Sequence, residues 1–227
     1  MANKIQAIFF DYGGTLDSIG LPWKEHFESI YRSMGVIQDQ AVFDRAFYDA
    51  DDSLTEEGLD AHGMKDMLDE QVGRVLSNLH IQDRAIHEKV VATFSANTVR
   101  SLQANQPVFE KLKKKYKLGI ISNFYGNLEA LCKELELMQW FDAVTDSRRV
   151  GHTKPHAEIF NHALKKLSVT PGCALMVGDS FKRDMLGAKA MGMPHVFLVS
   201  PHKQEQPQSC CDEDLVITNL ADLLEHF

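Results

Sequence analysis

The sequence predicts an α/β protein with a doubly wound, Rossmann-like parallel-sheet core and an inserted α-helical domain. In the second half of the chain, short apolar runs alternate with amphipathic helical stretches. This alternation is typical of a parallel sheet covered by helices on both faces. Between the first apolar run and the next, the chain shows only helical periodicity for roughly 80 residues, far longer than an ordinary connection. We therefore expect a core formed by residues 1–17 and 101–227 and a helical insertion over residues 18–100.

The composition favours a well-packed protein that does not bind nucleic acid or membranes. The 227 residues are 44% apolar, and the net charge is −8, which argues against a surface for nucleic acid or anionic lipid. No apolar run approaches the roughly 18 residues of a membrane span, and no secretion signal is recognisable. The four cysteines (Cys132, Cys173, Cys210 and Cys211) lack the spacing of metal ligands or of a disulfide framework. We expect a cytoplasmic protein.

The first strand is the centre of the prediction. The run Ile5 to Phe10 is apolar apart from Gln6 and ends in Asp11, which is followed by Gly13-Gly14. We expect a buried strand whose carboxyl end places Asp11 in the crevice where open α/β sheets bind ligands.

Four helices are expected in the insertion, from apolar residues spaced three or four apart. They are indicated by the stripes Trp23 to Met34, Val42 to Ala50, Met64 to Leu79 and Ile86 to Phe94. The acidic stretches Asp51-Asp52-Ser53 and Glu56-Glu57-Gly58 are interpreted as loops.

The rest of the chain predicts alternating elements. A helix beginning at Pro107 should precede a strand at Lys117–Ile121, with further strands at 143–145, 174–178 and 196–199 and an edge strand at 215–217. Helices are expected around 128–135, 155–167 and 180–191 and at the end of the chain, and the polar stretch 201–214 is interpreted as a mobile loop.

Chemically useful side chains follow three of these strands. Since parallel strands end at one edge of a sheet, Asp11, Ser122-Asn123 and Asp179 should meet there, with Lys154 at the start of a following helix. A carboxylate can attack phosphorus and form an acyl phosphate, and Ser122 and Lys154 can stabilise the transferred oxygens. Two neighbouring carboxylates call for a hard divalent cation with oxygen ligands, for which Mg²⁺ is the best candidate.

These segments resemble the four motifs of the haloacid dehalogenase-like (HAD) hydrolase superfamily. They are Asp11-Tyr12-Gly13-Gly14-Thr15-Leu16, Ile121-Ser122-Asn123, Lys154-Pro155 and Gly178-Asp179 through Asp184. The resemblance covers the core, and the insertion is similar to the helical cap of the subfamily that carries a cap after the first motif.

The resemblance implies a role for each motif residue. Asp11 is the expected nucleophile and a metal ligand, together with the backbone carbonyl of Gly13, and Thr15 orients the first loop. Ser122 and Asn123 bind the phosphate, and Lys154 neutralises the nucleophile and the substrate oxygens. Asp179 binds the metal, and Asp184 holds a metal water or Lys154. Lys182 and Arg183 are interpreted as a solvated face.

Gly13 departs from the pattern of the superfamily's phosphatases, which carry at this position an aspartate that acts as general acid and base. Loss of such a group usually costs about 10²–10⁴-fold in rate. The phosphonoacetaldehyde hydrolases lack this aspartate and use a cap lysine, for which Lys24, Lys65 and Lys89 are the candidates here. The haloacid dehalogenases also lack it and need no metal. Trp23, His26 and His62 are possible cap contacts to a substrate.

The sequence therefore predicts an enzyme: a Mg²⁺-dependent hydrolase of a small phosphorylated metabolite, acting through an aspartyl-phosphate at Asp11, with weak activity on simple phosphomonoesters. The alternatives are a phosphonate or haloacid hydrolase with the same nucleophile, and a catalytically weak binding protein. Substrate identity, the cap residues that contact it and the oligomeric state remain open.

Overall fold

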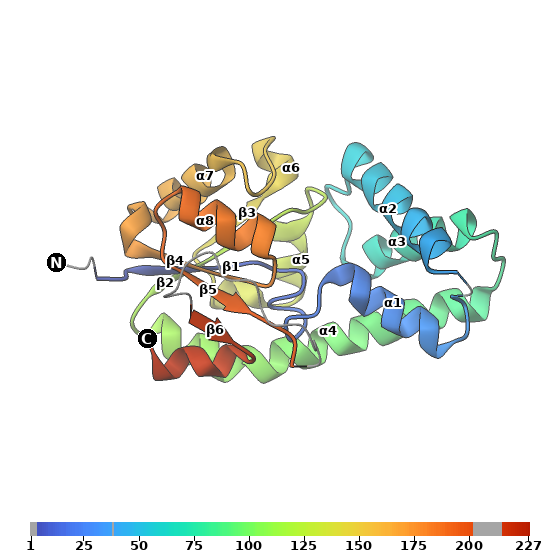
Figure 1. The fold of residues 1–227 in the computed structure, drawn as a ribbon, viewed down its shortest axis with the longest axis horizontal. Helices are drawn as coiled ribbons and strands as arrows, with labels where there is room; N and C mark the ends of the chain where they lie inside the picture. Colours follow the sequence, from blue (N-terminus) through green and yellow to red (C-terminus); the bar gives the residue numbers. More distant parts are fainter. Residues whose placement is uncertain (1–3, 38, 202–214) are drawn as a thin grey trace.

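A six-stranded parallel sheet forms the core of the protein (Figure 1). The computed structural model describes residues 4–37, 39–201 and 215–227. The strand order is β3-β2-β1-β4-β5-β6, and every neighbouring pair is parallel. The strands are β1 (Ala7–Phe10), β2 (Lys117–Ser122), β3 (Ala143–Asp146), β4 (Ala174–Gly178), β5 (His195–Leu198) and β6 (Leu215–Ile217). The predicted fold class is confirmed, and each predicted strand is present within two residues of its expected bounds.

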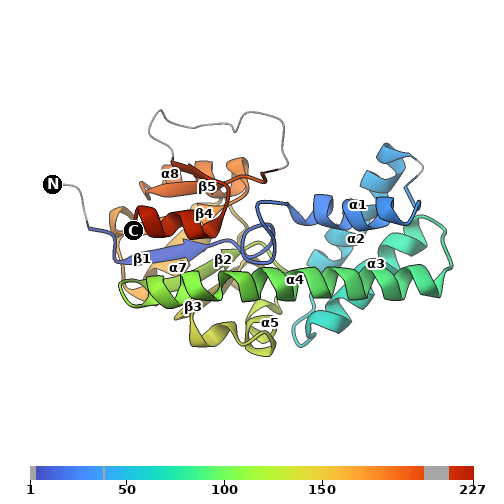
Figure 2. The same ribbon diagram turned by 90° about the horizontal axis from the view of Figure 1, so that it is seen from below.

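Helices cover both faces of the sheet because alternate residues of β1 enter two different apolar clusters. Phe9 packs with α7 (Ala157–Leu167) and α8 (Leu186–Ala190), whereas Phe10 packs with the end of α4 (Arg84–Lys113) and with the C-terminal helix η4 (Leu220–Glu225). The views agree on this layering (Figures 1 and 2). Since β1 is central and fully buried, its carboxyl end lies in the middle of the ligand-binding edge.

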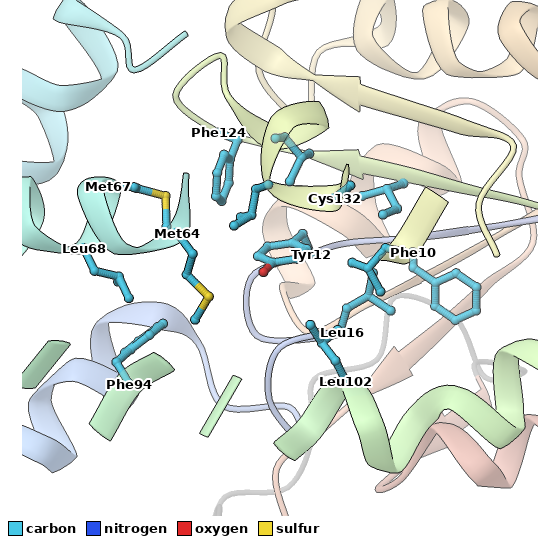
Figure 3. Close-up of a cluster of buried hydrophobic side chains, with 14 of the residues drawn as sticks. Phe10, Tyr12, Leu16, Met64, Met67, Leu68, Phe94, Leu102, Phe124 and Cys132 are labelled. Carbon is cyan, nitrogen blue, oxygen red and sulfur yellow. The ribbon is translucent and has the colours of Figure 1, made fainter. Parts of the chain in front are cut away.

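The inserted helices lie beyond the carboxyl ends of the strands (Figure 1). They are α1 (Trp23–Ser33), α2 (Gln40–Glu57), α3 (Met64–Asn78) and the first half of α4. Their apolar faces belong to the same continuous cluster as one face of the sheet. Figure 3 shows Tyr12 and Phe124 of the core near Met64 and Met67 of α3, so that Tyr12, which follows Asp11, is part of the contact between the two regions.

Two helix predictions were wrong. The acidic segment 51–57 is not a loop but the last part of α2, because the buried stripe continues from Phe47 and Ala50 to Leu54. The helices predicted on either side of residue 100 are one helix of 30 residues with Pro107 inside it. Proline removes one N–H bond, to the carbonyl four residues earlier. Gln103 and Pro107 are both exposed, so water can satisfy that carbonyl.

The remaining elements connect the strands. They are α5 (Leu128–Glu134), η1 (Leu137–Gln139), α6 (Ser147–Val150), η2 (Pro171–Cys173) and η3 (Phe181–Met185). The predicted helix after Asp179 begins as the π-helical turn η3 and continues as α8. The predicted 201–214 loop, with Cys210 and Cys211, lies almost wholly outside the described residues, and Cys132 and Cys173 are free thiols. Among the described helices, none combines the length and apolar character of a membrane span.

Candidate active site

Asp11 is buried at the carboxyl end of the central strand. Its N–H donates to the carbonyl of Val177 in β4 at 2.9 Å, and its side chain is held by the N–H of Tyr12, 2.7 Å from Oδ1. Only 4% of Asp11 is exposed. A buried carboxylate must find donors or cations, and the neighbouring strands supply them.

Ser122 and Lys154 converge on the same oxygen of Asp11. Ser122 Oγ donates to Oδ1 at 2.6 Å, and Lys154 Nζ lies 2.9 Å from it. Ser122 ends β2, beside β1, whereas Lys154 enters from the loop before α7. Asn123 holds that loop through both backbone groups of Lys154: its Oδ1 accepts from the N–H at 2.7 Å, and its Nδ2 donates to the carbonyl at 3.2 Å. Asn123 thus positions Lys154.

Lys154 bridges two carboxylates in the interior. Its Nζ also lies 2.6 Å from Asp184 Oδ1 and donates to the carbonyl of Ile121 at 2.8 Å. Burial opposes the charge of the ammonium, but Asp11 and Asp184 outweigh it and raise the pKa of Lys154. Burial also raises the pKa of Asp184 to about 6, although the Lys154 charge opposes this shift. The cluster therefore keeps a fixed positive charge beside Asp11.

Asp179 completes a set of oxygen ligands. Carboxylate oxygens of Asp11, Asp179 and Asp184 lie within 4.8 Å of one another. Thr15 Oγ1 donates to Asp179 Oδ1 at 2.9 Å, whereas the buried Oδ2 has no hydrogen-bond partner in the part of the chain that the structure describes. Burial, with the charges of Asp11 and Asp184, raises the pKa of Asp179 well above its usual range. A free buried oxygen in an all-oxygen cluster fits a hard cation such as Mg²⁺.

Two glycines allow these carboxylates to approach the backbone. A Cβ on Gly14, whose φ is +88°, would lie 2.3 Å from Asp179 Oδ2, and a Cβ on Gly178 would lie 2.4 Å from Asp184 Oδ2. Asp184 accepts the N–H of Ser180 at 3.0 Å through the same oxygen. Any side chain at either glycine would displace a carboxylate of the cluster.

Trp23 fills the space beside Gly13. A Cβ on Gly13 would lie 3.0 Å from both Cδ1 and Nε1 of this indole. The indole N–H donates to Asp17 Oδ2, and Asp17 Oδ1 accepts from the N–H of Gly14 at 2.7 Å. Asp17 is fully buried, and the sequence analysis assigned it no role.

A cavity of about 300 Å³ opens between Asp11 and the inserted helices. Core residues Asp11, Gly13, Ser122 and Asn123 form part of its wall, and the other lining residues are Trp23, Asp51, Asp52, Thr55, Phe124, Tyr125, Ser147, Thr153 and Arg183.

Asp51 and Asp52 went unrecognised because segment 51–57 was interpreted as a loop. Arg183 retains exposed surface as predicted, but it also lines the cavity. The sequence signal that could have indicated Asp51 and Asp52 was their place in the chain shortly before the buried Leu54.

The other cap candidates point elsewhere. Lys24, Lys65 and Lys89 do not line this cavity; Lys24 is paired with Glu28 and Asp44, and Lys65 with Asp69. The buried His26 stacks on Phe94 at 4.3 Å between ring centroids, and burial lowers its pKa to about 4. His62 also lies outside the cavity lining, and its carbonyl accepts from Asn127. Of the three predicted cap contacts, only Trp23 faces the site.

Comparisons with known proteins identify the family of this chain. The family model of haloacid dehalogenase-like hydrolases matches residues 5–192. A mouse protein named haloacid dehalogenase-like hydrolase domain-containing protein 3 is 29% identical over 88% of this chain and 84% of its own length. A glyceraldehyde 3-phosphate phosphatase of Pyrococcus furiosus is 37% identical over 56% of this chain and 54% of its own length. The solved structure of a dehalogenase with an intermediate complex superposes with a TM-score of 0.67 at 18% identity, covering 100% and 99% of the two chains.

The chain spans about half the length of several of these relatives. The cattle protein with the same name as the mouse relative is 34% identical over 49% of this chain and 53% of its own length. The structural match, at its low identity, bears on the fold alone.

Proposed function

Because the chain belongs to the haloacid dehalogenase-like hydrolase family, we propose that this hydrolase removes phosphate from a small phosphorylated metabolite through an aspartyl-phosphate at Asp11. The observation that carries the proposal is the convergence on Asp11 Oδ1 of the Ser122 hydroxyl and the Lys154 ammonium, at 2.6 and 2.9 Å. A nucleophilic carboxylate is most useful where donors are already placed for the charge that develops on the transferred group.

The residues of the cluster would act in a fixed order. Asp11 attacks phosphorus through a carboxylate oxygen, and the bond to the leaving oxygen breaks. Lys154 lowers the repulsion between the anionic nucleophile and the phosphoryl oxygens, and Ser122 donates to the transferred group. Water then attacks phosphorus, the bond to Asp11 breaks, and the free carboxylate returns. Asp184 and Asn123 keep Lys154 in place throughout.

We propose Mg²⁺ as the cofactor, held by Asp11, Asp179, Asp184 and the Gly13 carbonyl. The unpartnered Asp179 Oδ2 and the all-oxygen cluster support this choice. When bound, the ion supplies positive charge to the phosphoryl oxygens and relieves the repulsion among the three carboxylates. Thr15 orients Asp179 for this role through its 2.9 Å hydrogen bond.

Residues 18–100 would serve as a cap over the reaction. Core and insertion touch through Arg148, which donates to the Glu57 carbonyl at 2.9 Å, and through the Leu59 N–H, which donates to the Tyr125 carbonyl at 2.8 Å. The lining includes Trp23, Asp51 and Thr55 from the insertion. A closed cap excludes bulk water and adds contacts to the substrate.

The alternatives receive less support from the residues. Lys24, Lys65 and Lys89, which the structure describes, do not line the cavity, whereas imine chemistry on a phosphonate would need a lysine there. Carboxylate oxygens of three buried aspartates lie close together, and this arrangement favours a bound cation. Metal-independent dehalogenation does not need one. A relative named as a phosphatase is 37% identical over 56% of this chain, and the cavity of about 300 Å³ fits a small metabolite.

The test is a screen of phosphorylated metabolites with Mg²⁺, followed by trapping of the intermediate. Acid-quenched wild-type enzyme should carry one phosphoryl group on the peptide that contains Asp11, and Asp11→Asn should carry none and release no phosphate. The control is Asp142→Asn, which removes a surface carboxylate that is distant in the sequence from Asp11. Phosphate release that persists in Asp11→Asn would refute the proposal.

A further inference from the structure

Position 13 of the core offers the proposed reaction no proton donor. An alkoxide leaving group needs a proton as the bond to phosphorus breaks, and Gly13 has no side chain to give one. The space where a side chain at Gly13 would extend is occupied by the Trp23 indole, 3.0 Å from the position of a Cβ. An indole N–H is not acidic enough to act as a general acid, and this one donates to Asp17. The donor must therefore come from another part of the wall.

Asp51 of α2 is the carboxyl group best placed to serve. It lines the same cavity as Asp11 and Gly13. In-line displacement puts the leaving oxygen on the side of phosphorus opposite the nucleophile. Asp11 forms the sheet-edge side of the cavity, whereas Asp51, Asp52 and Thr55 belong to the inserted helix α2. A leaving group that points away from Asp11 therefore points toward the helical wall.

The Asp51 side chain is held in position by the core. The Tyr125 hydroxyl donates to Asp51 Oδ1, and Tyr125 itself is 5% exposed and follows the phosphate-binding motif at the end of β2. The Tyr125 hydrogen bond engages Oδ1 and leaves Oδ2 as the second carboxyl oxygen. One oxygen thus fixes the carboxyl group while the other is available for a proton.

The surroundings raise the pKa of Asp51 above its ordinary value. Burial raises the pKa of this carboxyl, the Tyr125 hydrogen bond opposes the shift, and the charge of Asp52 adds to it. The Arg183 guanidinium, on η3, acts in the opposite direction from across the cavity. Asp52 is exposed, and no hydrogen bond from the described part of the chain orients its carboxyl group.

We propose that Asp51 is the general acid and base of this hydrolase, supplied by the cap in place of a carboxyl group at position 13. The proposal rests on the proposed function. In the first step Asp11 attacks phosphorus, the ester P–O bond breaks, and the Asp51 proton passes to the leaving alcohol oxygen. In the second, water attacks phosphorus, the P–O bond to Asp11 breaks, and the water proton returns to Asp51. One ester and one water give one alcohol and one phosphate.

The experiment compares leaving groups in Asp51→Asn, which keeps an oxygen to accept from Tyr125. With an alkyl phosphate, kcat should fall by about 10²–10⁴-fold. With p-nitrophenyl phosphate the leaving phenolate needs no proton, so the variant should release one rapid equivalent of nitrophenolate per site and then turn over slowly, because the second step lacks its base. Tyr125→Phe should show the same pattern in weaker form.

Two controls keep the result specific. Asp52→Asn makes the same substitution in the neighbouring residue of the same wall and should alter both substrates alike, and Asp49→Asn, exposed on α2, should alter neither. Equal losses on both substrates in Asp51→Asn, without a burst, would overturn the assignment, as would unchanged kcat. If wild-type enzyme gives no phosphorylated Asp11, the proposed function fails and the assignment falls with it.

Discussion

The Trp23 indole occupies the space into which a side chain at Gly13 would extend. A Cβ at Gly13 would lie 3.0 Å from two atoms of the ring, and the ring is fixed by its hydrogen bond to Asp17 and by edge contacts with Phe27 and Phe94. The glycine at this position and the tryptophan 10 residues later are therefore one structural unit. Restoring an aspartate at position 13 has to displace an aromatic ring.

We expect Gly13→Asp alone to impair the protein. The new carboxylate meets a rigid ring, and overpacking of this kind costs about 1–3 kcal/mol. Urea unfolding should show the loss of stability, and phosphatase activity should fall or stay low. The double variant Gly13→Asp/Trp23→Ala opens the space and should have higher activity on alkyl phosphates than Trp23→Ala alone, which is the matched control. A gain of activity in Gly13→Asp with Trp23 intact would contradict this account of the site.

Asp17 should titrate near neutral pH. Burial raises its pKa to about 7, although hydrogen bonds from Trp23 and Gly14 oppose the shift. Since the Trp23 N–H donates to this carboxylate, the indole proton resonance should move with a midpoint near 7. The chain has two tryptophans, so Trp140→Phe assigns the signal. A resonance that does not move between pH 5 and 9, or that moves equally in Asp17→Asn, would refute the prediction.

The same group should make stability depend on pH. Its pKa is higher in the folded state than the ordinary value of 3.8, so its contribution is fully present below about pH 4 and is lost as pH rises through about 7. A shift of this size corresponds to about 4 kcal/mol. The free energy of unfolding of Asp17→Asn should therefore fall less steeply than that of the wild type across this range. Parallel curves would show that Asp17 is already ionised.

Mg²⁺ should stabilise the folded protein through the acidic cluster. Binding to the native state alone adds about 2.7 kcal/mol at 100 times Kd, which raises Tm by roughly 5–10 °C for a chain of this size. Asp179→Asn should abolish the shift without lowering the metal-free Tm, because burial and the charges of Asp11 and Asp184 disfavour an ionised carboxylate at this position and the amide carries no charge. Asp66→Asn, at the exposed start of α3, should keep the full shift. An equal shift in Asp179→Asn would exclude this site.

The sheet and the residues at its carboxyl edge could be predicted from the sequence, but the cavity wall that faces these residues could not. Asp11, Ser122 and Asp179 each follow an apolar run, and parallel strands bring such positions together without any knowledge of packing. Asp51 and Arg183 do not follow an apolar run in this way, so the strand pattern did not place them near Asp11. Asp51 reaches the cavity only because α2 continues past it to bury Leu54, and that continuation depends on contacts with other helices. Gly13 was recognised as unusual, but its partner Trp23 became apparent only in three dimensions.

Lys154 should stabilise the cluster more strongly at high pH than at low pH. Its side chain is 0% exposed and lies 2.9 and 2.6 Å from Asp11 and Asp184. Lys154→Met leaves these carboxylates buried without their cation, which costs about 3–5 kcal/mol when one partner of a buried pair is removed. The pKa of Asp184 is already raised to about 6 with the lysine present and rises further without it, so the carboxylates of the variant take up protons as pH falls.

The destabilisation of Lys154→Met should therefore be larger at pH 8 than at pH 5, as measured by urea unfolding without metal. Lys65→Met removes an exposed lysine that is paired with Asp69 at the surface and should leave the unfolding midpoint unchanged at both pH values. Saturating Mg²⁺ should restore part of the stability of Lys154→Met at pH 8, because the metal ion then neutralises Asp11 in place of the lost ammonium. It should not restore activity. A penalty that is independent of pH would mean that the lysine stabilises the fold by packing and not by its charge.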